Sequence, residues 1–245
     1  MSENIDQVAG RGEPLLLLPG LMCDARIFAS QSAAIAEALV PSDDGVSGGL
    51  AGMAERILES APPRFALLGH SMGARIALEM VRRAPDRVTR LALVSTGVHP
   101  VAKGEAEKRY ALRDVGRSQG MAALVDAWLP PMVAPDRAGD AGLMAPLRAM
   151  CIDAGLARYE AQAAALLSRP EVESLLPIIR VPTLVAVGGE DRWSPPEQHR
   201  AIAAAIADAD LLIVAGAGHM LPAEAPAALN AAIAEWLARP ALIKP

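Results

Sequence analysis

One short stretch constrains the fold of this chain more than any other, the pentapeptide Gly69-His70-Ser71-Met72-Gly73. An apolar run over residues 65–68 precedes it, and a run with helical character over residues 74–83 follows it. A serine therefore lies at the apex of a sharp turn between a predicted strand and a predicted helix. Such a turn needs small residues on both sides, because the backbone bends tightly and packs close to its neighbours. Gly69 and Gly73 meet that need.

Apolar runs elsewhere in the chain alternate with helical patterns. Buried-type strands are predicted at residues 15–18, 88–95, 183–187 and 211–214, with a further short strand indicated at 38–40. Helices are predicted at residues 25–39, 52–60, 196–207 and 226–238, and a turn at 41–45. Continuous apolar strands that alternate with helices are typical of a parallel sheet with helices on both faces.

The strand pattern stops between His99 and Ser174. Helical patterns occupy residues 105–117, 121–128 and 143–167, and prolines separate the last two. We therefore expect a core formed by residues 1–98 and 175–245, interrupted by an all-helical insert at 99–174.

Composition and charge exclude several classes of function. The net charge is −5, and the Lys and Arg residues are scattered, which argues against nucleic acid or an anionic membrane as a partner. No apolar stretch is long enough to cross a bilayer, and residues 1–12 lack the pattern of a signal peptide. Cys23 and Cys151 lack metal-like spacing, so free thiols in a reducing compartment are expected. We expect a cytoplasmic protein that acts on a small molecule, and the sequence does not indicate its oligomeric state.

Two further residues can serve the serine, whose hydroxyl is a weak nucleophile until a base takes its proton. His219 follows the predicted strand at 211–214, and Asp191 follows the one at 183–187. The carboxyl ends of parallel strands meet at one edge of a sheet, so we expect both side chains beside Ser71.

These motifs give the chain a resemblance to the α/β-hydrolase fold superfamily, in particular to its compact esterase and lactonase-like branch. The resemblance covers residues 15–237 and rests on four segments, 15–20, 69–73, 188–191 and 218–219. The chain order of serine, acid and histidine is also that of the superfamily. The resemblance implies an α/β-hydrolase fold, with a mostly parallel sheet flanked by helices. It further implies that the insert is a helical cap over the site and that no metal or organic cofactor is needed.

The resemblance implies a role for each site residue. Ser71 attacks a carbonyl carbon and forms an acyl-enzyme, His219 moves the proton, and Asp191 orients the imidazole. The oxyanion receives one hydrogen bond from the backbone N–H of Met72. By resemblance the second donor is the N–H of Leu21. Pro19 stands where many relatives carry histidine, but a backbone donor depends on the shape of the loop, so the oxyanion hole is expected to remain.

Other side chains are weaker candidates. Glu190 and Asp208 are the fallback acids, and His99 and His199 are the alternative bases. His70 is interpreted as a packed side chain rather than a second base. Cys23 has no base placed for it, so a small buried side chain is the better interpretation.

The insert and the arginines leave two questions open. Trp128 and Met132 are our candidates for substrate binding. They either line an acyl pocket or pack the insert onto the core, and the same two alternatives apply to Leu129, Met144 and Met150. A substrate carboxylate could bind Arg26, Arg75 or Arg109, although arginine is usually solvated.

The function expected from these residues is hydrolysis of a carboxylic ester, lactone or thioester of a small substrate. Carbon–carbon bond hydrolysis and perhydrolysis on the same triad are the alternatives within enzymes. A ligand-binding protein without turnover is the alternative outside them. Dehalogenases and epoxide hydrolases of this superfamily are disfavoured, because they carry aspartate at the position of Ser71.

Overall fold

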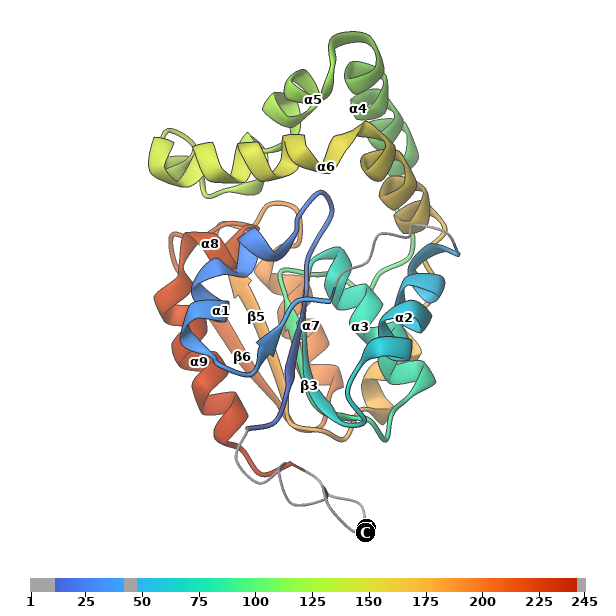
Figure 1. The fold of residues 1–245 in the computed structure, drawn as a ribbon, viewed down its shortest axis with the longest axis vertical. Helices are drawn as coiled ribbons and strands as arrows, with labels where there is room; N and C mark the ends of the chain where they lie inside the picture. Colours follow the sequence, from blue (N-terminus) through green and yellow to red (C-terminus); the bar gives the residue numbers. More distant parts are fainter. Residues whose placement is uncertain (1–11, 42–47, 242–245) are drawn as a thin grey trace, which may run out of the picture.

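A computed structural model describes residues 12–41 and 48–241 of the chain (Figure 1). Its centre is a six-stranded sheet in which each neighbouring pair of strands is parallel, in the order β2-β1-β3-β4-β5-β6. The strands are β1 (Leu15–Leu18), β2 (Ala38–Leu39), β3 (Phe65–His70), β4 (Val88–Val94), β5 (Thr183–Gly188) and β6 (Ala209–Val214). The parallel sheet flanked by helices is as predicted.

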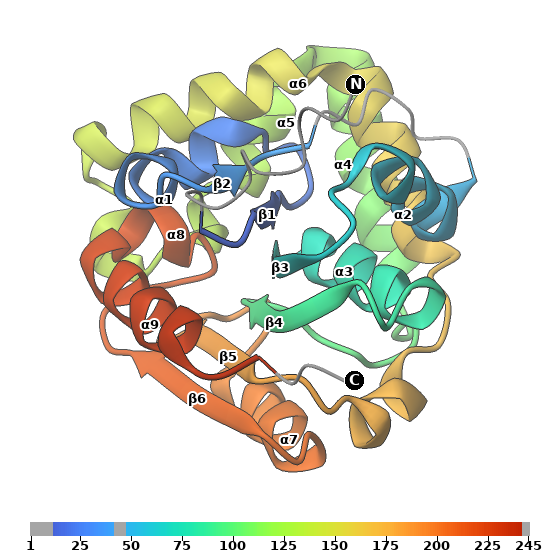
Figure 2. The same cartoon turned by 60° about the horizontal axis from the view of Figure 1, so that its bottom comes forward.

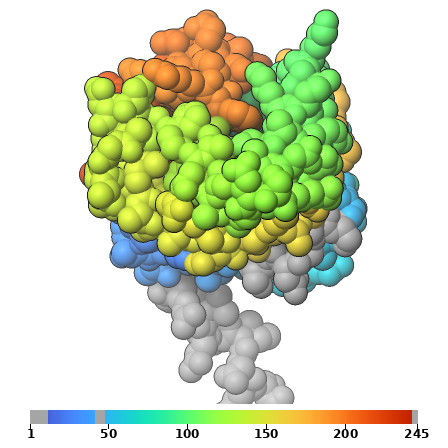
Figure 3. All heavy atoms as spheres, turned by 90° about the horizontal axis from the view of Figure 1, so that it is seen from above, coloured from blue at the N-terminus to red at the C-terminus, as the bar shows by residue number. Residues whose placement is uncertain are grey.

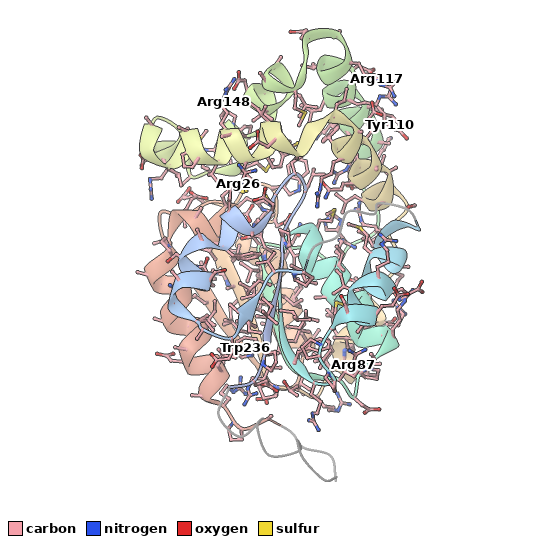
Figure 4. The ribbon with its side chains drawn as sticks, viewed as in Figure 1. Arg26, Arg87, Tyr110, Arg117, Arg148 and Trp236 are labelled. Carbon is pink, nitrogen blue, oxygen red and sulfur yellow. The ribbon has the colours of Figure 1, made fainter. Side chains whose placement is uncertain are left out.

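Helices cover both faces of this sheet, which is why the strands β1, β3 and β5 are buried along their whole length (Figure 2). One face carries α1 (Ala29–Ala34), α8 (Leu221–Glu224) and α9 (Pro226–Ala238), and the other carries α2 (Gly49–Ser60), α3 (Met72–Arg83) and α7 (Pro196–Ala205). Trp236 anchors α9 at the base of the core, where its buried indole N–H donates to the carbonyl of Pro182 at 3.0 Å (Figure 4).

The segment between β4 and β5 is described throughout and contains helices but no strand. Its long helices are α4 (Glu105–Gln119), α5 (Met121–Trp128) and α6 (Ala141–Leu167), joined by the short 3₁₀ helices η2 (Pro130–Met132) and η3 (Pro135–Arg137) and followed by η4 (Glu173–Ile178). In Figure 1, α4, α5 and α6 lie across the top of the sheet, and α6 bends at Gly155, where φ is +76°. We call α4, α5 and α6 the cap.

The first helical segment of the chain differs from its prediction. The single helix predicted at residues 25–39 is wrong: the chain forms a 3₁₀ turn, η1 (Ala25–Phe28), then α1, and it ends in β2. The reason is that the backbone turns extended at Ile35, so that Ala38 and Leu39 can pair with β1. Residues 1–11 and 42–47 lie outside the described part of the chain. Two predictions fall on them, the missing signal-peptide pattern at 1–12 and most of the turn at 41–45.

The strand order reverses between β1 and β3, and this reversal locates the site. The chain leaves β1 for β2 on one side and then crosses to β3 on the other. Ligands of open α/β sheets bind in the crevice at the carboxyl ends of the strands where the order reverses. Here the loop after β1 meets the turn after β3, and a Cβ atom on Gly73 would lie 2.1 Å from the carbonyl oxygen of Leu18.

Across residues 12–41 and 48–241, no helix combines the length and the apolar character that crossing a bilayer requires.

Gly73→Ala should destabilise the protein, because the added methyl group has no space beside Leu18 and the backbone must shift. Overpacking of this kind costs roughly 1–3 kcal/mol in the free energy of unfolding, and sometimes more. Gly139→Ala is the matched control, since its Cβ would meet nothing within 4 Å. Urea unfolding of the two variants measures the difference, and equal midpoints would show that the close approach is not required.

Candidate active site

Ser71 lies in a strained turn between β3 and α3. Its φ of +56° and ψ of −116° are rare for a residue with a side chain and cost on the order of 1–3 kcal/mol. Two hydrogen bonds hold the turn against β4 and the residues after it. The N–H of Ser71 donates to the carbonyl of Val94 at 2.8 Å, and the hydroxyl of Thr96 donates to the carbonyl of Ser71 at 3.0 Å.

The structure brings the predicted serine, histidine and aspartate together. The Oγ of Ser71 lies 2.9 Å from Nε2 of His219, and Nδ1 of His219 lies 2.8 Å from Oδ2 of Asp191. Because the carboxylate accepts the Nδ1–H, Nε2 is the acceptor for the serine hydroxyl. The other carboxylate oxygen, Oδ1, accepts the backbone N–H groups of Trp193 at 2.9 Å and Ser194 at 2.7 Å.

Asp191 is buried yet remains ionised. Burial by itself raises the pKa of this carboxyl group. The charge and hydrogen bond of His219, with the N–H of Ser194, outweigh burial and hold the pKa below its usual value. The fallback acids are not beside His219: Glu190 is exposed, and Asp208 pairs with Arg239.

Glu224, which we did not predict from the sequence, holds the loop of His219. Its buried carboxylate accepts the N–H groups of Gly218 at 2.9 Å, Met220 at 3.0 Å and Ala134 at 2.8 Å. Burial raises its pKa although these donors oppose the rise. The residue lies in the four-residue helix α8 and belongs to no motif. The one signal in the sequence is an acidic residue within an apolar stretch.

The segment between α5 and α6 also contacts this loop directly. The backbone N–H groups of His219 and Met220 donate to the carbonyl of Met132, at 2.8 and 3.2 Å. The residue that carries the candidate base is therefore tied both to α8 and to the segment that follows α5.

The other two buried histidines, His70 and His199, have partners of their own. His70 donates from Nε2 to the carbonyl of His219 at 2.8 Å, and its ring packs edge-on against Phe28. Burial, with the charge of His219 beside it, lowers the pKa of His70 to about 3. His199 accepts the N–H of Thr96 at 2.9 Å, and burial lowers its pKa to about 4. Both side chains are neutral and packed, as interpreted from the sequence for His70.

A cavity of about 270 Å³ opens beside Ser71. Its apolar lining includes Leu21, Met72, Trp128, Met132 and Leu166. Seen from above, the molecule is hollowed between the orange segment near residues 190–200 and the green segment near residues 100–110, both of which contribute to the lining (Figure 3).

The structure therefore divides the five candidate pocket residues of the insert into two groups. Trp128 and Met132 lie on the cavity, whereas Leu129, Met144 and Met150 are not part of its lining and pack among the apolar residues of the protein.

The two predicted oxyanion donors lie on the same cavity. Met72 is the first residue of α3, where a backbone N–H has no partner within the helix and the helix dipole favours negative charge. The N–H of Leu21 has no hydrogen-bond partner among the described residues. The next residue, Met22, donates its N–H to Oε1 of Gln162 at 2.9 Å, which fixes the loop from the cap.

Cys23, in the same loop, is a buried thiol. A hydrogen bond with the thiol of Cys151, together with burial, raises its pKa, so the thiolate needed for nucleophilic attack is disfavoured. Among the residues that the structure describes, no group of three His, Cys, Asp or Glu side chains could hold a metal ion.

Comparison with known proteins agrees with the fold. The model of the alpha/beta hydrolase family matches residues 15–232. This chain belongs to the alpha/beta hydrolase family. Its relatives within the family are hydrolases with several substrates.

Three similar proteins illustrate this range. A putative carbamate hydrolase, RutD, of Variovorax paradoxus is 27% identical over 252 residues, 93% of this chain and 92% of its own. A pimeloyl-[acyl-carrier protein] methyl ester esterase of Neisseria meningitidis is 28% identical over 66% of each chain. The solved structure of a thermophilic esterase from Thermogutta terrifontis, with malate bound, superposes with a TM-score of 0.81. It is 26% identical and covers 93% of this chain and 90% of its own.

Glu224→Ala should destabilise this alpha/beta hydrolase by about 3 kcal/mol or more, because each buried N–H left without an acceptor costs roughly 1–3 kcal/mol. The exposed Glu197, on α7, provides the control Glu197→Ala. Urea unfolding compares the two variants. Equal stability would show that the three N–H groups find other acceptors.

Stability should also fall in mild acid, because His70 and His199 are buried and neutral. In the unfolded chain histidine has a pKa of about 6.5, so below that pH the unfolded state binds protons that the folded state does not. Between pH 7 and pH 5 each residue should lower the free energy of unfolding by about 2 kcal/mol. Chemical unfolding at a series of pH values measures this, and His199→Gln should remove about half of the loss. The same acid loss in that variant would contradict the assignment.

Proposed function

We propose that this protein is a serine hydrolase that cleaves a carboxylic ester, lactone or thioester of a small substrate through an acyl-enzyme. The observation that carries the proposal is the hydrogen-bonded series from Ser71 through His219 to Asp191, with separations of 2.9 and 2.8 Å. In this arrangement the nucleophile, its base and the group that orients the base are all within hydrogen-bond reach.

In the proposed reaction the Oγ of Ser71 attacks the carbonyl carbon while Nε2 of His219 takes the hydroxyl proton. The oxyanion that forms accepts hydrogen bonds from the N–H groups of Leu21 and Met72. The imidazolium, which Asp191 stabilises, then protonates the leaving oxygen of an ester or lactone, or the leaving sulfur of a thioester. A water molecule, deprotonated by His219, attacks the acyl-enzyme by the same route and releases the acid and free Ser71.

Both the cavity and the relatives support this class of substrate. About 270 Å³ is below the range of roughly 300–1,000 Å³ that is typical of pockets for drug-sized ligands, which favours a small substrate. The names of the relatives include two esterases and a putative carbamate hydrolase, whose substrates have a carbonyl carbon bonded to oxygen or nitrogen. Carbon–carbon hydrolysis and perhydrolysis would use the same residues, so a substrate panel should contain a vinylogous diketone and a peroxide assay beside esters, lactones and thioesters.

Ser71→Ala should abolish ester hydrolysis and labelling by a fluorophosphonate. The reason is that, in the described structure, no other hydroxyl group on the cavity lies within hydrogen-bond distance of a base. Asp191→Asn should lower kcat by about 10⁴-fold through the wrong imidazole tautomer. Ser118→Ala, on an exposed turn of α4, is the matched control. Hydrolysis of p-nitrophenyl acetate and mass spectrometry of the labelled protein provide the measurements.

Unchanged turnover in Ser71→Ala would rule out the acyl-enzyme. A wild-type protein that takes no fluorophosphonate and turns over no member of the panel, but binds one of its compounds tightly, would favour a ligand-binding protein.

A further inference from the structure

The cavity beside Ser71 is strongly cationic. Among the described residues that line it there are six cationic side chains and one carboxylate, that of Glu105. The six are Arg75, Lys103, Lys108, Arg109, Arg169 and Arg192. The whole chain carries a net charge of −5, so this concentration of positive charge is a property of the cavity and not of the composition.

Glu105 is already shared by two of the arginines. Its Oε1 lies 2.8 Å from Nη2 of Arg109 and 2.7 Å from Nη1 of Arg169, and its Oε2 lies 2.7 Å from Nη2 of Arg169. Burial opposes ionisation of Glu105, but these hydrogen bonds overcome it and bring its pKa to about 2. The carboxylate therefore neutralises one charge of this pair and has none left for a third.

Arg75 is the third buried arginine, and among the described residues no carboxylate forms an ion pair with it, although Glu105 attracts it from a distance. It is 5% exposed, and within the described part of the chain it makes one hydrogen bond, from Nη2 to the carbonyl of His99 at 2.6 Å. A guanidinium group has five N–H donors, so most of them remain for a ligand. Burial, with repulsion from Arg169, lowers the pKa of Arg75 to about 10, which is still far above neutral pH. A buried charge without a partner is unfavourable, and a bound anion would relieve it.

The position of Arg75 relates this charge to the reaction. It lies in the first turn of α3, four residues after Ser71, and both residues line the cavity. A carbonyl carbon at the Oγ of Ser71 therefore leaves Arg75 within reach of a group a few bonds further along the substrate. Lys103, Lys108 and Arg192, all exposed, extend the positive field to the solvent side of the cavity.

We propose that Arg75, supported by Arg109 and Arg169, forms a subsite for an anionic group of the substrate. This group is a carboxylate or a phosphate-type group, and a short chain joins it to the scissile carbonyl. This assignment rests on the proposed serine hydrolase function and narrows it to anionic esters, lactones or thioesters. Arg75 binds the substrate in this scheme and takes no part in proton transfer.

A set of three p-nitrophenyl esters tests the subsite. The mono-ester of glutaric acid carries a carboxylate, the ester of 4-phosphonobutyric acid carries a phosphonate, and the ester of pentanoic acid is a neutral chain of matching length. In the wild-type protein one or both charged esters should exceed the neutral ester in kcat/KM by roughly 10- to 100-fold, as expected for hydrogen bonds to a charged group. The ester that is preferred identifies the anion.

Variants assign the preference to Arg75. Arg75→Gln should remove most of it by lowering kcat/KM for the charged ester much more than for the neutral ester, and Arg75→Lys should retain part of the preference. Arg148→Gln is the matched control. It also removes one positive charge from the protein, but Arg148 is on the outer surface of the cap, where it pairs with Asp126 (Figure 4). In this variant the ratio of kcat/KM for the charged ester to kcat/KM for the neutral ester should equal that of the wild type.

Binding without turnover separates this proposal from the proposed function. In a Ser71→Ala background, calorimetry with glutarate and with inorganic phosphate should detect binding that Arg75→Gln weakens at least tenfold. Equal kcat/KM for charged and neutral esters in wild type, with turnover still dependent on Ser71, would overturn the subsite and leave the hydrolase intact. If no ester is cleaved, the hydrolase proposal fails, and calorimetry alone decides the subsite: binding lost in Arg75→Gln supports it, and absence of binding overturns it.

Discussion

A close backbone contact between the end of β1 and the first turn of α3 determines the geometry of the whole site. Gly73, the second residue of α3, packs onto the carbonyl of Leu18 with no space for a side chain. The same approach brings the N–H of Leu21 to the cavity on which Met72 lies. The strained backbone of Ser71 persists because its neighbours on both sides are fixed in this way.

Much of this arrangement could be predicted because it follows from local patterns and one general rule. The strands at 65–70, 183–188 and 209–214 each contain a continuous apolar run, and a parallel sheet gathers their carboxyl ends on one edge. Ser71, Asp191 and His219 each follow such a strand, so their proximity could be expected without knowing the packing of any side chain.

The rest could not be predicted, because it depends on contacts between segments that are distant in the sequence. Nothing in the sequence around Glu224 indicates that three backbone N–H groups from two other segments point at its carboxylate. The helical pattern of the insert also does not indicate that Trp128 lies on the cavity whereas Met150 packs away from it. Arg26 and Arg75 were equal candidates for a substrate carboxylate, and their environments differ entirely. Arg26 pairs with Asp24 and Asp153, and Arg75 pairs with no carboxylate in the described structure.

The hydrogen bonds from His219 and Met220 to the carbonyl of Met132 have a consequence for how such enzymes diversify. The segment that covers the cavity also fixes the position of the imidazole relative to Ser71. A cap transplanted from a relative would change more than the shape of the cavity. Unless the graft presents a carbonyl at the same point after its second helix, the imidazole shifts, and in the proposed mechanism proton transfer then slows for every substrate alike. Cap exchange in this molecule is therefore best made at boundaries that retain residues 130–134 with the core.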